Sequence, residues 1–270
     1  MSFVNRFAVI IPVHNALEDL KRCLHSIEIK TTTPITLILI NDASDESTTS
    51  FLIEYSKRNN AIYAETNKDT PKGFSRASNL GITLAKGADY YCILNSDTII
   101  GTAGWNDKIM FVGDSHPDTG ILSVVSNCAT SQTLFFPKYI KITKIDSIVQ
   151  SLTDHRYPTI ALPNGFCYII KKQVVCRIGM FDASIFPHYG SEDHYSLVAR
   201  KANIISRIVD DVFIWHKGQA SYGQERDQIV KETIKRLKRE HGDKFVQDLV
   251  KTNCEGLSYL RERIIGYFKR

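Results

Sequence analysis

Long apolar runs are missing from this 270-residue sequence. The longest, such as Phe7 to Pro12 and Leu37 to Ile40, fall far short of the roughly 20 residues that a helix needs to cross a bilayer. No segment near the N-terminus combines a basic start, a long apolar stretch and a small-residue cleavage site. The sequence therefore predicts neither a membrane-spanning helix nor a signal peptide.

Cysteine spacing of the kind that binds zinc or carries redox chemistry is also absent. None of the six cysteines forms a C-x-x-C pair, and they are scattered over the chain as Cys23, Cys92, Cys128, Cys167, Cys176 and Cys254. Disulfides are rare in the cytosol. We therefore interpret these residues as reduced, mostly buried thiols of a cytoplasmic protein.

The sequence has no large excess of one charge, since its formal net charge is +5 at pH 7. Its 43% hydrophobic and 23% charged residues are typical of a globular protein that folds unaided. From Glu225 to Arg270, twelve Lys or Arg stand against eight Asp or Glu, which is +4 of the +5. This basic tail either forms a solvated helical face or attracts anionic lipid headgroups at the inner face of the cell membrane, and no nucleic acid partner is expected.

The first half of the chain alternates short apolar, β-branched runs with segments of helical character. We expect strands at 7–13, 35–40, 61–65, 90–94 and 121–125, and helices at 17–28, 46–58, 74–86 and 104–114. This order is typical of an α/β fold with a mostly parallel sheet. The near-continuous apolarity within the runs indicates a sheet covered by helices on both faces.

The regular alternation fails after about residue 126. Residues 126–163 look irregular, and they are followed by an expected strand at 164–170, a helix at 192–202 and a strand pair at 204–215. From residue 224 onward the pattern is helical and highly charged. We predict one domain over 1–222, with halves 1–125 and 126–222, and a C-terminal helical extension over 223–270.

Polar residues cluster directly after four of the predicted strands, at 12–15, 41–45, 67–73 and 95–97. Each cluster taken singly is ordinary turn chemistry. In parallel sheets, however, ligands bind at the carboxyl ends of the strands, and these clusters share that edge. We therefore expect a nucleotide site there, with Asn41-Asp42 hydrogen-bonding the base and the Lys72-Gly73 loop beside it.

Asn95 and Asp97 follow the apolar run at 91–94. If the backbone stays extended, alternation places both side chains on the same side. Two oxygen ligands at this spacing are able to hold Mg²⁺ or Mn²⁺, which neutralises a diphosphate. The alternative is a turn or a helix cap, which the same pattern often forms.

The ordered set of these motifs resembles glycosyltransferase family 2, which has the GT-A fold. The resemblance covers roughly residues 7 to 222 and is carried by 9–15 (VIIPVHN), 39–45 (LINDASD), Asn67 with 73–74 (GF) and 79–81 (NLG), 94–97 (LNSD), 164–166 (NGF), 178–182 (IGMFD), 190–193 (GSED) and 215–218 (WHKG). The whole set is much more specific than any single member.

The resemblance implies a metal-dependent, inverting transfer of a sugar from a nucleotide-diphosphate sugar to an acceptor hydroxyl, with Mn²⁺ or Mg²⁺ as cofactor. It also implies a surface polysaccharide or a lipid-linked glycan as the product. The implied donor-binding residues are Pro12, Val13, Asn15, Asp42, Asn67, Gly73, Asn79, Asn95 and Ser96.

The same resemblance makes Asp97 the principal metal ligand of the family's DXD motif and His216 a further contact to the metal or diphosphate. This chain departs from the motif because Asn95 replaces the first Asp. An amide oxygen is able to bind metal or ribose, but it brings no charge. Lys217 and Gly218, together with Ser221 and Tyr222, are placed to form a flap over the donor.

Glu192-Asp193 resembles the family's acidic pair on the helix that faces the acceptor. Displacement at an anomeric carbon needs a base that takes the acceptor proton. We assign Asp193 as this base and Glu192 as its support. The competing interpretation is a helix start capped by Ser191, with acids favoured in the first turn.

Three other functions compete with sugar transfer. A nucleotidylyltransferase is expected to carry a glycine-rich, basic loop after the first strand, and 12–16 (PVHNA) has no glycine, lysine or arginine. A glycoside hydrolase needs two carboxylates on opposite sides of the scissile bond, which adjacent Glu192 and Asp193 do not obviously provide. The last alternative is a non-catalytic module that binds sugar nucleotides.

Overall fold

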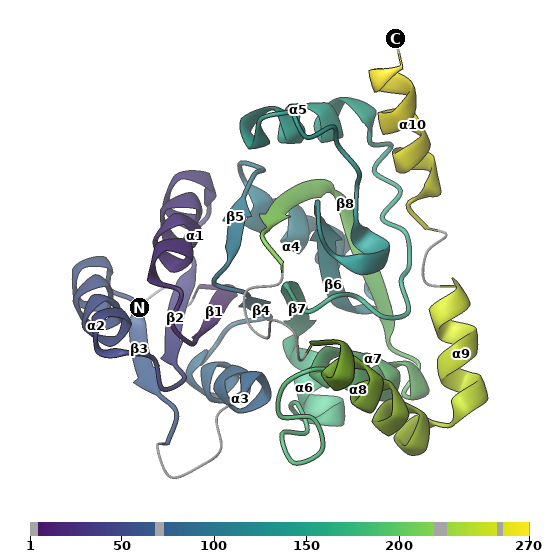
Figure 1. The fold of residues 1–270 in the computed structure, drawn as a ribbon. Coiled ribbons are helices and arrows are strands. Elements are labelled where there is room, and N and C mark those ends of the chain that lie inside the picture. The colour runs from purple at the N-terminus through teal and green to yellow at the C-terminus, as the bar shows by residue number, and fades with distance from the viewer. Residues whose placement is uncertain (1–4, 68–72, 219–225, 253–255, 270) are drawn as a thin grey trace.

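The computed structural model describes residues 5–67, 73–218, 226–252 and 256–269. Eight strands form one sheet in the order β3-β2-β1-β4-β7-β6-β8-β5, with helices on both faces (Figure 1). The strands are β1 (Phe7–Val13), β2 (Thr36–Asn41), β3 (Ile62–Glu65), β4 (Tyr90–Leu94), β5 (Thr98–Ile100), β6 (Thr119–Val125), β7 (Cys167–Lys171) and β8 (Ile205–His216). The α-helices are α1 (Leu17–Lys30), α2 (Glu46–Asn59), α3 (Phe74–Leu84), α4 (Trp105–Ser115), α5 (Ile142–Leu152), α6 (Lys172–Ile178), α7 (Ser191–Lys201), α8 (Arg226–His241), α9 (Asp243–Thr252) and α10 (Ser258–Phe268).

The sheet is mostly parallel, which confirms the predicted fold class. β1 pairs in parallel with β2 and β4, and β2 pairs in parallel with β3. β7 runs antiparallel between β4 and β6, while β8 is parallel to β6 and antiparallel to β5. The carboxyl ends of β1 to β4 therefore lie at one edge, where the sequence predicted the ligand site.

Alternate residues of β1 enter two hydrophobic layers. Phe7, Val9 and Ile11 pack in a layer that includes α1 and α4, whereas Ala8 and Ile10 pack in a layer that includes α3, α6 and α7. All five are fully buried. Because helices cover both faces, nearly every position of the central strand is apolar, as the sequence indicated.

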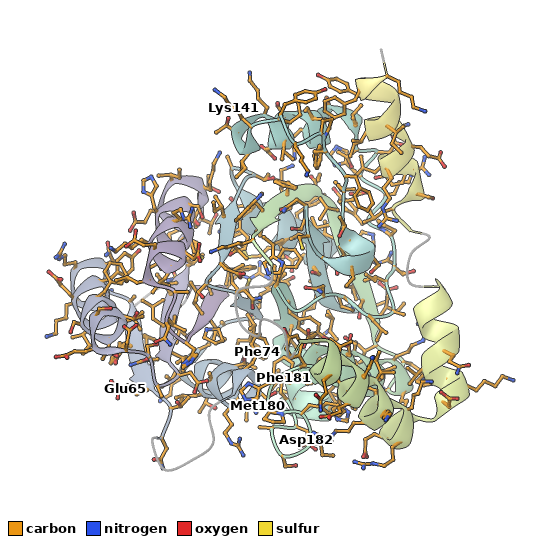
Figure 2. The ribbon with its side chains drawn as sticks, in the orientation of Figure 1. Glu65, Phe74, Lys141, Met180, Phe181 and Asp182 are labelled. Carbon is orange, nitrogen blue, oxygen red and sulfur yellow. The ribbon has the colours of Figure 1, made fainter. Side chains whose placement is uncertain are left out.

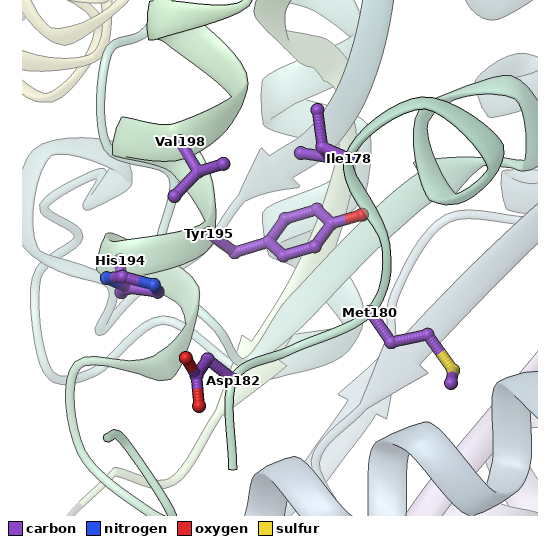
Figure 3. Close-up of a pocket in the computed structure, with 6 residues that line it drawn as sticks. All are labelled: Ile178, Met180, Asp182, His194, Tyr195 and Val198. Carbon is purple, nitrogen blue, oxygen red and sulfur yellow. The ribbon is translucent and has the colours of Figure 1, made fainter. Parts of the chain in front are cut away.

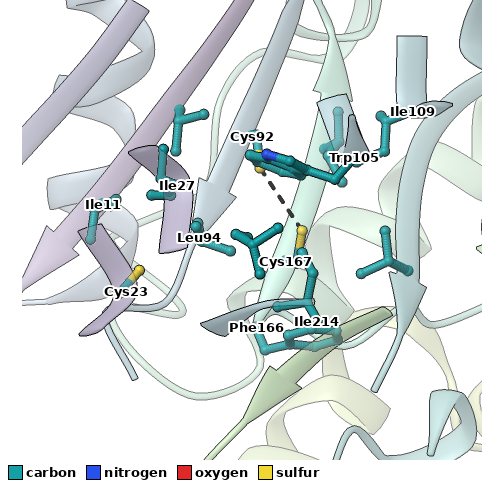
Figure 4. Packing of buried hydrophobic residues seen from close by; sticks show 14 of the residues in the cluster. Ile11, Cys23, Ile27, Cys92, Leu94, Trp105, Ile109, Phe166, Cys167 and Ile214 are labelled. Carbon is teal, nitrogen blue, oxygen red and sulfur yellow. Dashed lines mark hydrogen bonds between the residues drawn. The ribbon is translucent and has the colours of Figure 1, made fainter. Parts of the chain in front are cut away.

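Cysteine side chains belong largely to the first of these layers. Cys92 Sγ lies 3.9 Å from Cys167 Sγ between β4 and β7 (Figure 4). Cys23, Cys92 and Cys167 are buried free thiols, while Cys128 and Cys176 are free and exposed; Cys254 lies outside the described residues. The prediction of buried thiols therefore holds for three of these positions.

The expected strand pair at 204–215 is wrong, because β8 is one long strand. Its pairing with β6 shifts from Val124 opposite Val209 to Val125 opposite Phe213. Asp210 and Asp211 fall within this bulge, and both are buried. The two polar residues between apolar runs suggested a turn, but the bulge keeps them in the strand.

The segment 126–163 is less irregular than expected. It contains a short 3-10 helix (Thr130–Gln132) and α5, whose Ile145, Ile148 and Val149 are buried. Their i, i+3, i+4 spacing is typical of a helix, although no helix was predicted here. β5 and α6 were not anticipated either.

The C-terminal helices pack onto the rest of the chain at two places. In α8, Leu237 is buried in a cluster with Phe186 and Leu197. In α10, Leu260 and Ile264 are buried in a cluster that includes residues of α5 and β8. Among the residues that the structure describes, no helix is long and apolar enough to cross a membrane.

Candidate functional site

Asp42 follows β2 and ties two loops together at the expected edge. Its Oδ1 accepts a hydrogen bond from Thr66 Oγ1 at 2.7 Å, and its Oδ2 accepts one from the Gly73 N–H at 2.9 Å. The side chain is only 6% exposed. Asp42 therefore shapes the loop that begins α3 while it lies in the predicted base pocket.

The turn after β1 lies against the turn after β2. Asn15 has a positive φ of 61°, its N–H donates to Ser44 Oγ, and its Oδ1 accepts from the Asp45 N–H. His14 Nδ1 lies 2.8 Å from the Asp42 carbonyl oxygen. The structure thus brings Asn15 and Asp42 together, as predicted.

Several other residues that were predicted to bind the donor differ in their exposure and in their contacts. The Val13 side chain is fully buried in the core and Pro12 is half-buried in β1, while Asn67 is exposed. Asn79 bonds both backbone groups of Phe181, at 2.8 Å and 3.0 Å, so its amide joins α3 to the segment after α6. The side chains of Val13 and Asn79 are thus held in packing contacts.

Gly73 marks a close approach of two chain segments. A Cβ atom at this position would lie 2.5 Å from the Pro187 carbonyl oxygen. The same oxygen accepts from the Ser75 N–H, and Ser75 Oγ donates to the Phe186 carbonyl. Segment 186–187 is therefore fixed against the start of α3, next to Asp42.

His188 was not singled out from the sequence. The pKa of its imidazole is lowered by burial, opposed by the nearby charge of Asp42 and reinforced by His14 and Arg76. These side chains therefore share one neighbourhood at the base of the candidate site. No local sequence signal connects His188 to Asp42, because they are far apart in the chain.

The backbone from Asn95 to Asp97 does not stay extended as assumed. A turn at residues 96–97 separates β4 from β5. The Asn95 N–H donates to the Phe166 carbonyl, and the Asn95 carbonyl accepts from Thr98 Oγ1 at 2.8 Å. The turn, rather than strand alternation, therefore sets the direction of the two side chains.

Asp97 and His216 meet although 118 residues separate them in the chain. His216 Nε2 lies 3.4 Å from Asp97 Oδ1, and both side chains are largely buried. His216 Nδ1 lies 2.7 Å from the Cys128 carbonyl oxygen, and the ring stacks on Phe166 with centroids 5.2 Å apart. The residues proposed from the sequence as metal contacts are thus neighbours.

The hydrogen bond to the Cys128 carbonyl determines which nitrogen of a neutral His216 ring carries the hydrogen. A carbonyl oxygen only accepts, so Nδ1 carries the hydrogen and Nε2 directs its lone pair toward Asp97. A donating Nδ1 is the arrangement found in metal-binding histidines. Metal bonds of about 2.1 Å at right angles place two ligand atoms about 3 Å apart, so the Asp97 and His216 donors fit one divalent cation.

The donor set is small. Among the described residues, no group of three or more His, Cys, Asp or Glu side chains is placed to hold a metal ion. Asp97 and His216 therefore leave room for other oxygen ligands, which a diphosphate supplies in magnesium sites.

The predicted flap begins with residues that are anchored. The Lys217 N–H donates to the Asp97 carbonyl at 3.1 Å, and Lys217 Nζ lies 2.7 Å from Asp19 Oδ2 on α1. Gly218 lies against Cys128 Sγ. Ser221 and Tyr222 lie outside the described residues, as does Lys72.

Glu192 and Asp193 lie in the first turn of α7, as expected. Burial raises the pKa of the Glu192 carboxyl, and the neighbouring Asp193 raises it further. Burial also raises the pKa of Asp193. Paired carboxyls that retain a proton above the usual range are suited to proton transfer near neutral pH.

The capping role considered for Ser191 is wrong. The residue at the N-cap is Gly190, with φ 82° and no side-chain capping bond, and Ser191 Oγ donates instead to the His188 carbonyl. The helix start is therefore held by backbone geometry and by segment 188–190. The Glu192 carboxyl accepts hydrogen bonds from its own N–H, in the first turn of the helix, and from the Gly165 N–H.

Two consecutive residues connect the acid pair to the Asp97–His216 pair. A Cβ atom at Gly165 would lie 2.8 Å from the Glu192 carboxyl carbon, while Phe166 stacks on His216. Glycine at 165 permits this close approach. The acids on α7 and the metal-type donors therefore border the same part of the structure.

A separate cavity of about 320 Å³ lies beside α7 (Figure 3). It is lined by Ile178, Met180, Asp182, His194, Tyr195 and Val198. At 3.6 residues per turn, His194 and Val198 point away from the flank that carries Glu192 and Asp193. This cavity is thus distinct from the strand-end site.

Comparison with known proteins is consistent with this geometry. Residues 8–128 match the model of glycosyl transferase family 2. The segment that resembles the uncharacterized glycosyltransferase YibD of Escherichia coli is 31% identical over 97 residues, which is 36% of this chain and 27% of YibD. The N-terminal part of the chain is therefore similar to glycosyl transferase family 2.

Solved structures of glycosyltransferases share the fold of this chain. The mannosyltransferase PcManGT from Pyrobaculum calidifontis, in complex with GDP-Man and Mn²⁺, superposes with a TM-score of 0.66 at 13% identity over 99% of this chain and 75% of that one. GalNAc-T7 with UDP, GalNAc and Mn²⁺ gives a TM-score of 0.64 at 14% identity over 98% and 55% of the two chains. The fold of this chain is therefore GT-A.

Proposed function

We propose that the protein transfers a sugar, with inversion, from a nucleotide-diphosphate sugar to an acceptor hydroxyl. The observation that carries this proposal is the Asp97–His216 pair at the strand-end edge, connected through residues 165–166 to the acids of α7. One pair provides donors for a cation and the other provides a base. A transfer of this kind requires both.

A divalent cation, Mn²⁺ or Mg²⁺, would be held by Asp97 and His216, with Asn95 as a neutral oxygen ligand or a ribose contact. When bound, it stabilises the negative charge that develops on the departing diphosphate. The Mn²⁺ in the complexes of PcManGT and GalNAc-T7 supports this choice of metal.

Asp193 takes the proton from the acceptor hydroxyl in the proposed reaction. As that O–H bond breaks, the acceptor oxygen forms a bond to the anomeric carbon. The bond from that carbon to the diphosphate oxygen breaks, and a nucleoside diphosphate leaves. Attack from the face opposite the leaving group inverts the anomeric centre, while Glu192 stays protonated and supports the base.

The donor nucleotide is proposed to lie along the ends of β1, β2 and β4. Asn15, Asp42 and Gly73 border the base and ribose, and Ser96 lies beside the diphosphate. The backbone of Pro12 and Val13, with Asn67, completes the pocket, whereas Asn79 supports it through Phe181. GDP-Man and UDP in the solved glycosyltransferases support a sugar-nucleotide donor.

The acceptor is proposed to be a glycan or a lipid-linked glycan, with the enzyme in the cytoplasm and in peripheral contact with the membrane. Residues 1–222 would form the catalytic unit and 223–270 the extension. Neither the nucleotidylyltransferase nor the non-catalytic binding module is favoured by a specific observation. The turn after β1 offers no glycine-rich phosphate loop for a nucleotidylyltransferase. The proximity of Asp97 and His216, which suits them to bind one cation, argues against a module that only binds sugar nucleotides.

A screen of nucleoside diphosphates and their sugars by thermal unfolding tests the proposal. A ligand that binds only the folded state raises the unfolding temperature with the logarithm of its concentration over Kd. We expect the unfolding temperature to rise with the nucleotides of one base. This rise should be larger with Mn²⁺ and absent with a chelator. Transfer with the selected donor, followed by NMR of the product, would give the anomeric configuration. No shift with any nucleotide in the presence of Mn²⁺ would refute the proposal.

A further inference from the structure

The most exposed aromatic side chains of the described chain lie in one short basic segment. Phe135 is 68% exposed and Tyr139 is 75% exposed. Lys138, Lys141 and Lys144 are exposed in the same segment. We call these five residues the basic–aromatic face.

The charge of this face is not compensated locally. None of its three lysines forms an ion pair with another described residue, and residues 133–144 include no Asp or Glu. Lys141 and Lys144 lie one turn apart at the start of α5, whose Ile145 and Ile148 face the core. Both lysines are exposed because they lie at the N-terminal end of the helix, Lys141 at the N-cap and Lys144 in the first turn.

The face has firm support beneath it. Phe136, between the two exposed residues, packs on Phe213 of β8 with ring centroids 5.9 Å apart. Arg261 of α10 donates through Nε to the Thr133 carbonyl at 3.0 Å. Exposure of Phe135 and Tyr139 is therefore a property of an anchored segment.

Helix α5 lies at one end of the molecule, together with the C-terminal end of α10 (Figure 1). In the view of Figure 2, Lys141 lies at the opposite end from Met180 and Asp182. α10 adds Ile265 and Tyr267, which are 49% and 50% exposed. Aromatic rings flanked by lysines are the composition that binds the interface of an anionic bilayer.

We propose that the basic–aromatic face binds the surface of a membrane that contains anionic phospholipids. Phe135 and Tyr139 enter the headgroup region, and Lys138, Lys141 and Lys144 contact lipid phosphates. This inference rests on the proposed function for its purpose, since it brings a lipid-linked acceptor near the active site.

The segment that carries the basic–aromatic face and the strand that ends at His216 pack against one buried cluster. Trp215 and Phe136 pack against the same buried cluster, and the next residue after Trp215 is His216. The face thus shares its buried support with the strand that carries one of the proposed metal ligands.

The basic helix α8, which the sequence suggested, is the weaker candidate. Its Lys231, Lys235 and Arg239 are exposed, but Glu232 and Glu240 are interleaved with them. The helix contains no Phe, Tyr or Trp, and it packs on α7 through Leu237. α8 thus lacks the aromatic component that an interfacial anchor needs.

Co-sedimentation of the full chain with vesicles tests the proposal. One set contains phosphatidylcholine and phosphatidylglycerol, and the other contains phosphatidylcholine alone. We expect binding to the first set and weak binding to the second, with loss of binding at high salt because exposed charges are screened. No sedimentation with the anionic vesicles would overturn the proposal.

Three variants locate the contact. Lys138→Gln with Lys141→Gln and Lys144→Gln should weaken binding on the order of 100-fold, about fivefold for each lysine. Phe135→Ser with Tyr139→Ser should also reduce binding. The control, Lys231→Gln with Lys235→Gln and Arg239→Gln, removes the same charge from α8 and should bind nearly as the parent does.

The remaining outcomes are decisive as well. Loss of binding in the α8 variant alone would move the contact to α8, and a changed oligomeric state with unchanged vesicle binding would make the face a contact between copies of the chain. All these side chains are exposed, so unfolding temperatures should match the parent. Nucleotide binding measured on the same samples separates the two proposals, since either one is able to fail while the other stands.

Discussion

His216 Nε2 faces Asp97 Oδ1 across 3.4 Å, while Nδ1 of the same ring is fixed by the Cys128 carbonyl. A lone pair and a carboxylate aimed at each other repel unless a proton or a cation lies between them. A divalent cation between the two atoms would remove this repulsion, and its presence is open to experiment.

Asp97→Ala should lower turnover by about 10³-fold or more, because a bound metal contributes several kcal/mol to stabilising the leaving diphosphate. His216→Ala should have a smaller effect of the same kind. Calorimetry with a nucleoside diphosphate, with and without Mn²⁺, measures the binding part of this loss. Asn95→Asp serves as the control and should retain or tighten Mn²⁺ binding. Undiminished Mn²⁺-dependent binding in Asp97→Ala would exclude the site.

Asp193→Asn should reduce turnover by about 10² to 10⁴, the usual contribution of general-base catalysis. The amide keeps the size and hydrogen-bonding capacity of the carboxyl but removes its basicity. Affinity for the nucleoside diphosphate and metal should hardly change, because the base acts on the acceptor. Glu192→Gln is the matched variant: if it is the more damaging of the two, the roles of the acids are exchanged.

The pH dependence should show both acids. Burial raises the pKa of Asp193 to about 6, and burial with the Asp193 charge raises the pKa of Glu192 to about 8. We expect kcat/KM to fall as the pH is lowered through about 6, since the base becomes protonated. A second change in kcat/KM should occur near pH 8, and the variant Glu192→Gln should lack it. A profile that is flat between pH 5 and about 9 would contradict the assignment.

The same shifts predict an effect on stability. Both folded pKa values exceed the roughly 4 of exposed carboxyls, so the folded state binds more protons than the unfolded state above about pH 4. These groups therefore destabilise the fold progressively as the pH rises from about 4 to 8. The double variant Asp193→Asn with Glu192→Gln should unfold at a higher temperature than the parent, and this gain should be larger at pH 8 than at pH 5. Calorimetry would measure it. An equal gain in unfolding temperature at the two pH values would show that the acids are not desolvated.

Gly73→Ala should destabilise the fold by about 1–3 kcal/mol, as overpacking usually does. The added Cβ would lie 2.5 Å from the Pro187 carbonyl and would separate segment 186–187 from α3. Because Asp42 bonds the Gly73 N–H, nucleotide binding should weaken too. Gly266→Ala is the control, since nothing lies within 4 Å of its added Cβ on α10. Urea unfolding of both variants gives the comparison. Equal changes in the free energy of unfolding would show that the structure accommodates the added Cβ beside Pro187 at little cost.

The first half of the fold could be predicted because its information is local. Strand β1 was predicted at its observed bounds, since seven consecutive residues report burial on both faces. β8 was misjudged because Asp210 and Asp211 have partners distant in sequence, such as Tyr259 and Lys108. Local polarity does not distinguish a buried, partnered acid from an exposed one.

The candidate site was predictable in its residue types but not in its contacts. The family resemblance pointed to Asp97, His216 and Asp193. The Cys128 carbonyl that orients His216 left no trace in the sequence, because any residue supplies a carbonyl oxygen. His188 was missed for a similar reason: its position beside Asp42 depends on how segment 186–187 meets α3.

Tyr259 sets a practical limit on shortening the chain. Its hydroxyl bonds the buried carboxylate of Asp210, and its ring lies beneath the Arg156 guanidinium at 4.1 Å. A chain cut at residue 222 keeps every candidate donor, metal and acid residue, but it removes that hydroxyl and uncovers the apolar cluster that Leu260 closes. Such a fragment should aggregate for reasons unrelated to catalysis, so inactivity after truncation would say nothing about a chemical role for the tail.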